Sequence, residues 1–301
     1  MLKWWGRNST NCNPDSYLQK LFIPIRFSVL TSSKNWAISR KDNFDIYKEA
    51  LFAKERMEAK LLLFRELVVP NLRRINALAE DVDLQVIVLS STHLPDSYKA
   101  QLNEIVNGCS FISISYIDES AAITPSIDSL IRSHLDKASS NVAFATTRLD
   151  DDDLLAEQFI PKIKKYIHPG FCDHIISFSR GYESYLDIET LQLSPNIKIS
   201  SPKIALGLSH INFYNKADNK LMGKIGNVYG AGDHTLVHEN FTLIIDHSRA
   251  MFLRMSYNEQ DTGAKGIFAR IKRRDCAIVE ADEIFNRFPE LHNLVKPHNS
   301  Q

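Results

Sequence analysis

Short apolar runs alternate with segments of helical periodicity through the first half of the chain, and this alternation limits the fold more than any other feature. Runs of strand length, rich in β-branched residues, occupy residues 22–30, 84–90, 111–117 and 142–146. Between them, apolar residues recur at helical spacing over residues 47–67, 95–106 and 124–135. This order predicts an α/β fold, a Rossmann-like, mostly parallel sheet with right-handed crossovers, flanked by helices.

The alternation of strand-like and helical segments ends after Pro169. Short strand-like runs separated by turns follow at residues 173–178, 204–213, 241–246 and 250–256. They predict antiparallel additions to the edge of the sheet in the C-terminal half. No internal repeat or low-complexity linker interrupts the chain, so we expect a single domain over residues 1–301, with residues 1–20 as a flexible N-terminal extension.

Composition excludes several classes of protein. Lys plus Arg and Asp plus Glu number 36 each, so no overall positive charge draws the chain to nucleic acid. The four cysteines lie far apart and form no CxxC pair, which argues against a disulfide framework or a zinc site and favours reduced thiols. The N-terminus lacks the apolar region of a signal peptide, and no apolar run is long enough to span a bilayer. We therefore expect a cytoplasmic protein.

Four consecutive aspartates, Asp150 to Asp153, follow the buried strand predicted at residues 142–146. Adjacent carboxylates raise one another's pKa unless a cation neutralises them. The carboxyl ends of parallel strands are also where open α/β sheets bind ligands. Hard oxygen ligands suit Mg²⁺ or Mn²⁺, which bind a few carboxylates together with substrate phosphates. The alternative is that the aspartates start a helix over residues 154–166, where acidic residues favour the N-terminal dipole.

The segment TRLDDDDLL at residues 147–155, with Phe159 and Ile160 after it, resembles the signature of the bacterial putative rhamnosyltransferase family. More broadly it is similar to the DxD motif of GT-A glycosyltransferases. The resemblance implies a GT-A-like fold, a nucleotide-sugar donor, a divalent metal, and transfer of a sugar, possibly rhamnose, to a glycan or lipid-linked glycan acceptor in surface polysaccharide synthesis. Residues 20–168 would form the nucleotide-binding half and residues 169–301 the acceptor-side half.

The resemblance also suggests roles for individual residues of the donor side. Asp150 would contact the nucleotide ribose or the metal, Asp152 would bind the metal, and Asp153 would complete or support the metal site. Arg26, at the end of the first strand, and Arg148 would lie near the nucleotide. Structural or surface ion pairs are the alternative roles of these two arginines.

A C-terminal metal ligand is harder to assign. His247 is our candidate, because a histidine completes the metal shell in many GT-A enzymes. The segment at residues 252–257, FLRMSY, falls where the family would have Trp-Leu-Gln-x-x-His. Tyr257 stands at the position of that histidine, which is a departure from the family pattern.

An inverting transferase needs a general base that deprotonates the acceptor hydroxyl. Asp233, on a turn after the glycine-rich segment at residues 223–232, is our candidate, and a helix N-cap is its alternative role. His234, His238 and Glu239 are weaker candidates. Basic residues then cluster at Lys265, Arg270, Lys272, Arg273 and Arg274, where peripheral contact with anionic lipid or simple solvation would both fit.

Two other functions use the same residues. A metal-dependent nucleotidyltransferase or phosphohydrolase would bind its ion through the same carboxylates. A non-catalytic carbohydrate-binding protein would hold a structural ion there.

Overall fold

The computed structural model describes residues 16–31, 44–260 and 265–295. Most of the expected N-terminal extension lies outside these residues. The first strand, β1 (Tyr17–Arg26), begins within the range predicted for that extension.

The N-terminal half forms the parallel sheet that the sequence predicts. Its strands are β1, β2 (Val82–Ser91), β3 (Ile112–Ile117) and β4 (Asn141–Thr147), hydrogen-bonded in the order β3-β2-β1-β4. The chain thus builds outward from β1 to β3 and then returns to the other side of β1. The reversal creates a switch point between the carboxyl ends of β1 and β4, where open α/β sheets bind ligands.

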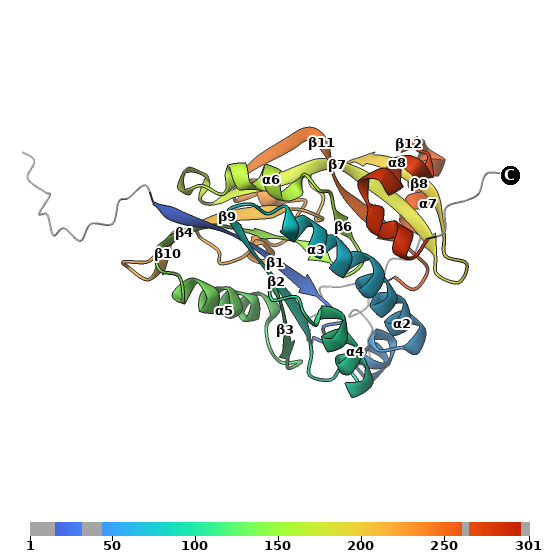
Figure 1. Ribbon diagram of the computed structural model, residues 1–301, viewed down its shortest axis with the longest axis horizontal. Coiled ribbons are helices and arrows are strands. Elements are labelled where there is room, and N and C mark those ends of the chain that lie inside the picture. Colours follow the sequence, from blue (N-terminus) through green and yellow to red (C-terminus); the bar gives the residue numbers. More distant parts are fainter. Residues whose placement is uncertain (1–15, 32–43, 261–264, 296–301) are drawn as a thin grey trace, which may run out of the picture.

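Helices cover both faces of this sheet (Figure 1). One face carries α2 (Lys54–Leu63), α3 (Val69–Ala77) and α4 (Asp96–Val106), and the other carries α5 (Ile123–Asp136). Strand β4 serves both cores, since Ala143 and Ala145 pack on the first face and Val142 and Phe144 on the second. Burial on two faces explains why these strands read as continuous apolar runs.

Pro70 does not interrupt the helix. A π-helical stretch, Phe64–Val68, joins α2 to α3, and Pro70 lies in the first turn of α3. Proline cannot donate a backbone hydrogen bond, and the carbonyl of Glu66, four residues before it, accepts instead from the side-chain amide of Asn293 at 2.9 Å. Helix α1 (Phe44–Leu51) precedes this unit.

The C-terminal half adds the long strands β7 (His174–Asp187), β8 (Gln192–Ser200) and β9 (Ser209–Asn215). As predicted, these additions are antiparallel, β9 to β4, β7 to β9 and β8 to β7. Strand β11 (Thr242–Ser256) differs, because it runs parallel to β7 and joins the two strands predicted at 241–246 and 250–256. Its pairing is irregular between Asp246 and Ala250.

Short elements complete the fold. The two-residue strands are β5 (Leu149–Asp150), β6 (Leu154–Leu155), β10 (Lys220–Leu221) and β12 (Ala277–Ile278). The remaining helices are α6 (Phe159–Ile163), α7 (Lys265–Arg273) and α8 (Ala281–Arg287). Short 3-10 turns lie at Lys164–Tyr166, Pro169–Phe171, Val228–Ala231, Val237–Glu239 and Pro289–Asn293.

The prediction of a helix over residues 154–166 is wrong for its first turn. Leu154 and Leu155 form β6 and pair with β11, so the helix begins only at Phe159. Asn71 fixes this arrangement, because its side chain donates to the Leu155 carbonyl at 2.9 Å and accepts from the Leu155 N–H at 3.0 Å. Tertiary pairing therefore overrides the local helical pattern. The aspartates precede a strand and do not cap a helix.

We predict that Asn71→Ala lowers the free energy of unfolding by about 2–6 kcal/mol, because two buried backbone groups lose partners worth roughly 1–3 kcal/mol each. Asn71 is fully buried. Urea denaturation measures the change. Asn103→Ala, in the exposed part of α4, is the control and should change stability by less than about 0.5 kcal/mol. Equal effects of the two substitutions would contradict the role of Asn71.

A second prediction concerns His210 of β9, which is fully buried and lies 3.3 Å from Asp173 through Nε2. Burial lowers the pKa of His210 to about 4. Because this pKa is lower in the folded state than in the unfolded state, protonation of His210 favours unfolding. The folded protein therefore has its full stability above about pH 6.5 and loses stability as the pH falls toward 4. Between pH 7 and pH 5 the parent should lose about 2 kcal/mol more stability than His210→Gln. Identical pH dependence of the two would refute this.

Candidate active site

The acidic run lies at the switch point of the sheet. Strand β4 leads into β5, which continues along β1 and pairs Asp150 with Arg26 in register. A turn at Asp151 and Asp152 then reverses the chain into β6. The fold thus places the aspartates at the carboxyl ends of β1 and β4, as the sequence predicts.

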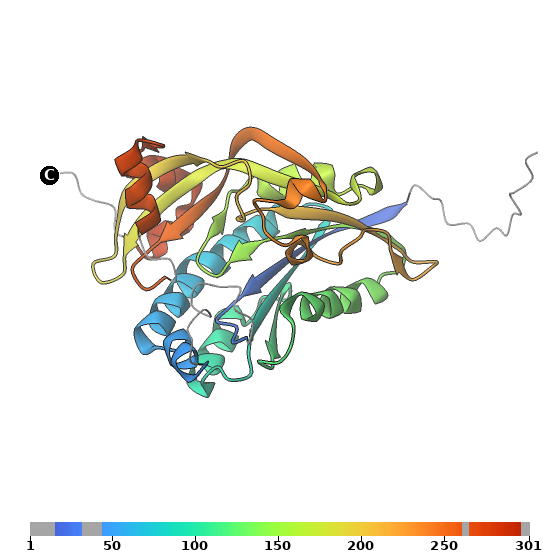
Figure 2. The ribbon, with the colours of Figure 1, turned by 180° about the vertical axis from the view of Figure 1, so that it is seen from behind.

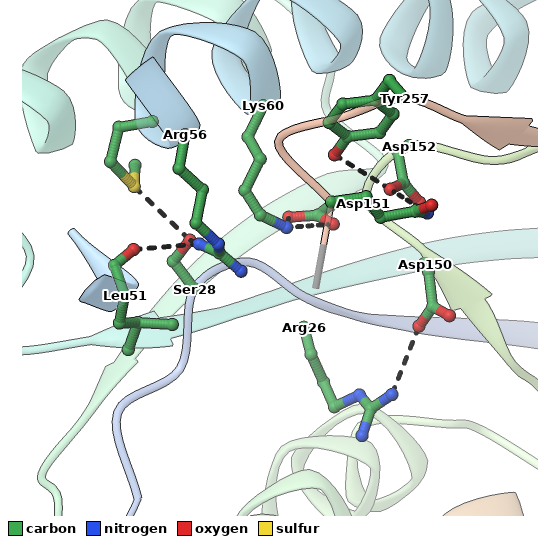
Figure 3. Close-up of polar contacts among 11 residues, drawn as sticks. Arg26, Ser28, Leu51, Arg56, Lys60, Asp150, Asp151, Asp152 and Tyr257 are labelled. Carbon is green, nitrogen blue, oxygen red and sulfur yellow. Dashed lines mark hydrogen bonds and ion pairs between the residues drawn. The ribbon is translucent and has the colours of Figure 1, made fainter. Parts of the chain in front are cut away.

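Each of the four carboxylates has a different partner, and Figure 3 shows three of them, those of Asp150, Asp151 and Asp152. Asp150 is half-exposed and accepts a hydrogen bond from Nη2 of Arg26 at 3.2 Å. Asp151 is buried, and both of its oxygens accept from Nζ of Lys60, at 2.6 and 2.5 Å. Asp153 is buried too and accepts from the backbone N–H of Met255 at 3.0 Å.

Asp152 is held by the end of β11 and the residues after it. Its Oδ2 accepts from the Tyr257 hydroxyl at 3.0 Å and from the Gln260 amide at 2.9 Å. Tyr257, noted in the sequence as a departure from the family pattern, therefore does reach the acidic run. Burial and the charge of Asp152 raise the pKa of Tyr257 well above its usual value, so the hydroxyl stays a donor.

Charge is unevenly compensated along the run. Burial and then the charge of Asp151 raise the pKa of Asp152 to about 7. Burial and the charge of Asp152 raise the pKa of Asp153 well above its usual value. At Asp150, partial burial acts upward, but the charges of Arg26 and Arg148 outweigh it and lower the pKa. In its fully ionised form the turn would therefore carry more negative charge than the neighbouring cations neutralise.

This excess of negative charge suits a divalent cation, but the protein would provide only part of the ion's coordination shell. Among the residues that the structure describes, no three His, Cys, Asp or Glu side chains are grouped to hold a metal. Mg²⁺ commonly takes one or two carboxylates and completes its shell with water and substrate phosphates. Half-exposed Asp150, with Asp152 two residues on, fits this manner of binding. Asp153 is occupied by the backbone of β11.

His247 is not brought to the aspartates. It is exposed in the irregular part of β11, where its Nδ1 lies 2.5 Å from the Ser179 hydroxyl. Strand β11 meets β6 only at Phe252 and Leu253. Five or more residues of strand correspond to roughly 16 Å. A role of His247 in the same metal shell finds no support in this arrangement.

The two predicted arginines meet at one aromatic ring. The guanidinium groups of Arg26 and Arg148 lie 4.8 and 5.0 Å from the centre of the Tyr229 ring. The Tyr229 hydroxyl donates to the carbonyl of Pro24 on β1 at 3.1 Å. Cations stacked on an aromatic face keep their N–H groups available for anions at the ring edge. Beside Asp150, these arginines form a cationic patch suited to phosphate.

Tyr229 belongs to the glycine-rich segment at residues 223–232 and lies in its 3-10 turn, Val228–Ala231. Asn227 anchors this segment, since its amide donates to Asp128 of α5 at 2.6 Å and its oxygen accepts from the Tyr229 N–H at 2.9 Å. The next N–H, of Val228, donates to the Thr146 hydroxyl at the end of β4 at 2.8 Å. A segment 80 residues away along the chain thus covers the switch point, and periodicity could not predict this.

Asp233 follows this segment on an exposed turn. Its Oδ1 accepts from both the N–H and the hydroxyl of Thr235 at 2.8 Å, and these bonds lower the pKa of Asp233. The 3-10 turn Val237–Glu239 has Leu236 as its N-cap, so Asp233 does not cap a helix as the alternative predicted. Its bonds from Thr235 close a turn before that element, and Oδ2 takes no part in them. His234 Nδ1 lies 3.7 Å from Asp233. Burial and then Arg148 lower the pKa of His234, so the turn lies beside the cationic patch.

The other candidates point elsewhere. His238 contacts Lys203 at 3.0 Å in a shallow pocket lined also by Glu239. Within the predicted basic cluster, Arg270 pairs with buried Glu183, whereas Lys272 and Arg273 of α7 are exposed. Within the described part of the chain, no helix combines the length and apolar character needed to cross a membrane.

Lys60 and Gln260 are site residues that the sequence analysis missed. Lys60 lies in the apolar stripe of α2 and is only 7% exposed. A lysine between Ala59 and Leu61 on an otherwise buried helical face is a signal for a buried ion pair. No local pattern singles out Gln260.

Comparison with solved structures gives only distant likenesses. A putative glucose-1-phosphate thymidylyltransferase from Bacillus anthracis, in complex with sucrose, is 9% identical, with a TM-score of 0.35 and coverage of 85% of this chain and 95% of that one. TarS residues 1–349 from S. aureus are 13% identical, with a TM-score of 0.30 and coverage of 92% and 68%. A putative nucleotide-diphospho-sugar transferase from Desulfovibrio desulfuricans G20 is 9% identical, with a TM-score of 0.34 and coverage of 93% and 94%.

No curated protein matches the chain. The family described as putative rhamnosyl transferase matches residues 21–268, which include the parallel sheet, the acidic turn and β11. The match covers well over half of the sequence. The chain belongs to the putative rhamnosyl transferase family.

Proposed function

We propose that this protein is a metal-dependent, inverting glycosyltransferase that moves a sugar, rhamnose by the family's description, from a nucleotide-sugar donor to a glycan or lipid-linked glycan acceptor. Family membership supports the transferase class. The observation that carries the proposal is the acidic turn at the switch point, with Asp150 facing Arg26 and a pair of arginines stacked beside it.

The donor diphosphate would lie between the arginines and the acidic turn. Arg26 and Arg148 would bind phosphate oxygens through their planar N–H groups. Asp150 and Asp152 would hold Mg²⁺ or Mn²⁺, which when bound supplies positive charge to the leaving diphosphate. Tyr257 fixes the orientation of the Asp152 carboxylate, as outer-shell partners of metal ligands do.

The acceptor would approach from the turn at Asp233. In an inverting displacement, the acceptor oxygen attacks the sugar C1 while the C1–phosphate oxygen bond breaks, and a base takes the hydroxyl proton. We assign Oδ2 of Asp233 as that base, because the bonds from Thr235 use Oδ1. His234 offers a second proton acceptor in the same turn.

Location is part of the proposal. We place the protein in the cytoplasm, with peripheral contact at the inner membrane where lipid-linked acceptors are built. The exposed cations Lys272 and Arg273 on α7 are suited to anionic headgroups.

We predict that Asp152→Asn weakens Mn²⁺-dependent binding of nucleotide sugars at least about 10-fold, since even outer-shell substitutions cost 10–100-fold in metal affinity. A thermal-shift screen of nucleotide sugars with and without Mn²⁺ identifies the donor, and calorimetry measures the loss. Asp96→Asn, a highly exposed aspartate on α4, is the control. If nucleotide sugars raised the Tm equally with and without Mn²⁺, the metal-dependent form of the proposal would be wrong.

Product analysis distinguishes the enzyme classes. Release of nucleoside diphosphate with a glycosylated acceptor supports the transferase, whereas release of pyrophosphate would indicate a nucleotidyltransferase. Donor binding with no turnover in the presence of acceptor extracts would favour a carbohydrate-binding protein.

For the base, we predict that Asp233→Asn lowers kcat about 10²–10⁴-fold while donor affinity stays unchanged. The asparagine oxygen still accepts from Thr235, so the turn should persist. Asp218→Asn, on the turn between β9 and β10, is the matched control. If Asp233→Asn kept full activity while His234→Gln lost activity, the histidine would be the base. If both variants kept full activity, the proposal of a base in this turn would be refuted.

A further inference from the structure

A separate cavity of about 490 Å³ lies at the other end of the molecule from β3, among β7, β8, β11 and α8. Its volume is within the range of sites for small molecules. Figure 1 shows α8 and β12 at this end, against β7 and β8. Among the residues described, none of those proposed for the donor or acceptor side lines this cavity.

The cavity opens on one face of the sheet only. Successive residues of a strand point to opposite faces. Accordingly, the Tyr182 hydroxyl donates to Glu283 of α8 at 2.6 Å, whereas neighbouring Glu183 pairs with Arg270 of α7. Figures 1 and 2 show the two helices on either side of β7 and β8. Tyr182 and Glu283 line the cavity, so it lies on the α8 face.

Positive charge predominates in the cavity. Among the described residues, its cationic side chains are Arg180, Lys198, Arg249 and Arg287, against the carboxylates of Asp275 and Glu283. Both carboxylates are already engaged: Glu283 lies 3.0 Å from Lys198, and Asp275 lies 2.7 Å from Arg273. Within the described chain, Arg180 and Arg249 form no ion pair with a carboxylate.

The backbone brings these two arginines together. Arg180 of β7 pairs with Ala250 of β11 on one side and with Ser200 of β8 on the other. The pairing of β11 is irregular just before Ala250, and such irregularities re-aim side chains. Arg249 therefore lies one residue from the sheet partner of Arg180, and both arginines line the cavity. The Arg287 guanidinium, 5.6 Å from the centre of the Tyr182 ring, supplies a third cation from α8.

We propose that this cavity is a second ligand site, which binds the phosphate group of a small phosphate ester of about monosaccharide size. A phosphate offers three oxygens and up to two charges, and so matches a pair of guanidinium forks better than a carboxylate does. The Ser200 hydroxyl is a further donor, and Ile199 and Ala250 form apolar wall for the rest of the ligand. The proposal does not depend on the reaction at the acidic turn.

Calorimetric titration at constant ionic strength tests the site. The probes are glucose 1-phosphate, inorganic phosphate, glucuronate and glucose, added to the full-length protein. We expect glucose 1-phosphate to bind with one-to-one stoichiometry, inorganic phosphate more weakly, and glucose not at all. In Arg180→Gln/Arg249→Gln the affinity for glucose 1-phosphate should fall at least about 10-fold, because each charge-assisted hydrogen bond is strong. Arg65→Gln, an exposed arginine on the π-helical stretch, is the matched control.

A second variant separates this site from the donor site, since a sugar phosphate could also bind there. Binding should survive Arg148→Gln and should continue in the presence of saturating nucleoside diphosphate. Unchanged affinity in the double variant, or loss of binding in Arg148→Gln alone, would overturn the proposal. Tighter binding of glucuronate than of glucose 1-phosphate would overturn the phosphate class. Both arginines are exposed, so circular dichroism and Tm should match the parent, and single Arg249→Gln serves if the double variant is unstable.

Discussion

The buried ion pair between Lys60 and Asp151 is the interaction on which the acidic turn depends. Both oxygens of Asp151 contact the ammonium group, and both side chains are almost fully removed from solvent. A charge buried without its partner costs several kcal/mol, so neither residue tolerates loss of the other. The pair fastens α2 to the turn after β5. It also neutralises one of the aspartates internally, whereas Asp150, Asp152 and Asp153 have other partners.

The contacts around Asp150, Asp152 and Asp153 compensate the charges of these carboxylates to different extents. Asp150 faces Arg26 and solvent, and its pKa falls, whereas Asp152 and Asp153 are buried and their pKa values rise. Raised carboxyl pKa values caused by burial and by neighbouring carboxylates are common at functional sites. The hydrogen bond from Tyr257 partly offsets the rise at Asp152 through a neutral donor that adds no positive charge.

The site joins two halves of the chain that could not form it separately. Asp150 and Arg26 come from the parallel half, whereas Tyr229, Asp233 and Tyr257 come from residues 169–301. Strand β11 makes this possible, because it runs parallel to β7 and ends beside the acidic turn. The candidate site therefore includes residues from both halves of the chain. The Tyr229 ring that contacts the two arginines, for example, belongs to the second half.

Sequence alone determined the parallel half of the sheet and the position of the acidic run at a strand end, because strand burial and strand-end chemistry are local properties of the chain. The family resemblance pointed to Arg26, Arg148 and position 257. Only the tertiary structure decided that Leu154 and Leu155 form a strand, that Lys60 neutralises Asp151, that Tyr229 lies beneath the arginines, and that His247 is far along β11. Each of these depends on pairing between residues distant in sequence, whose energy exceeds the small local preferences that a sequence pattern expresses.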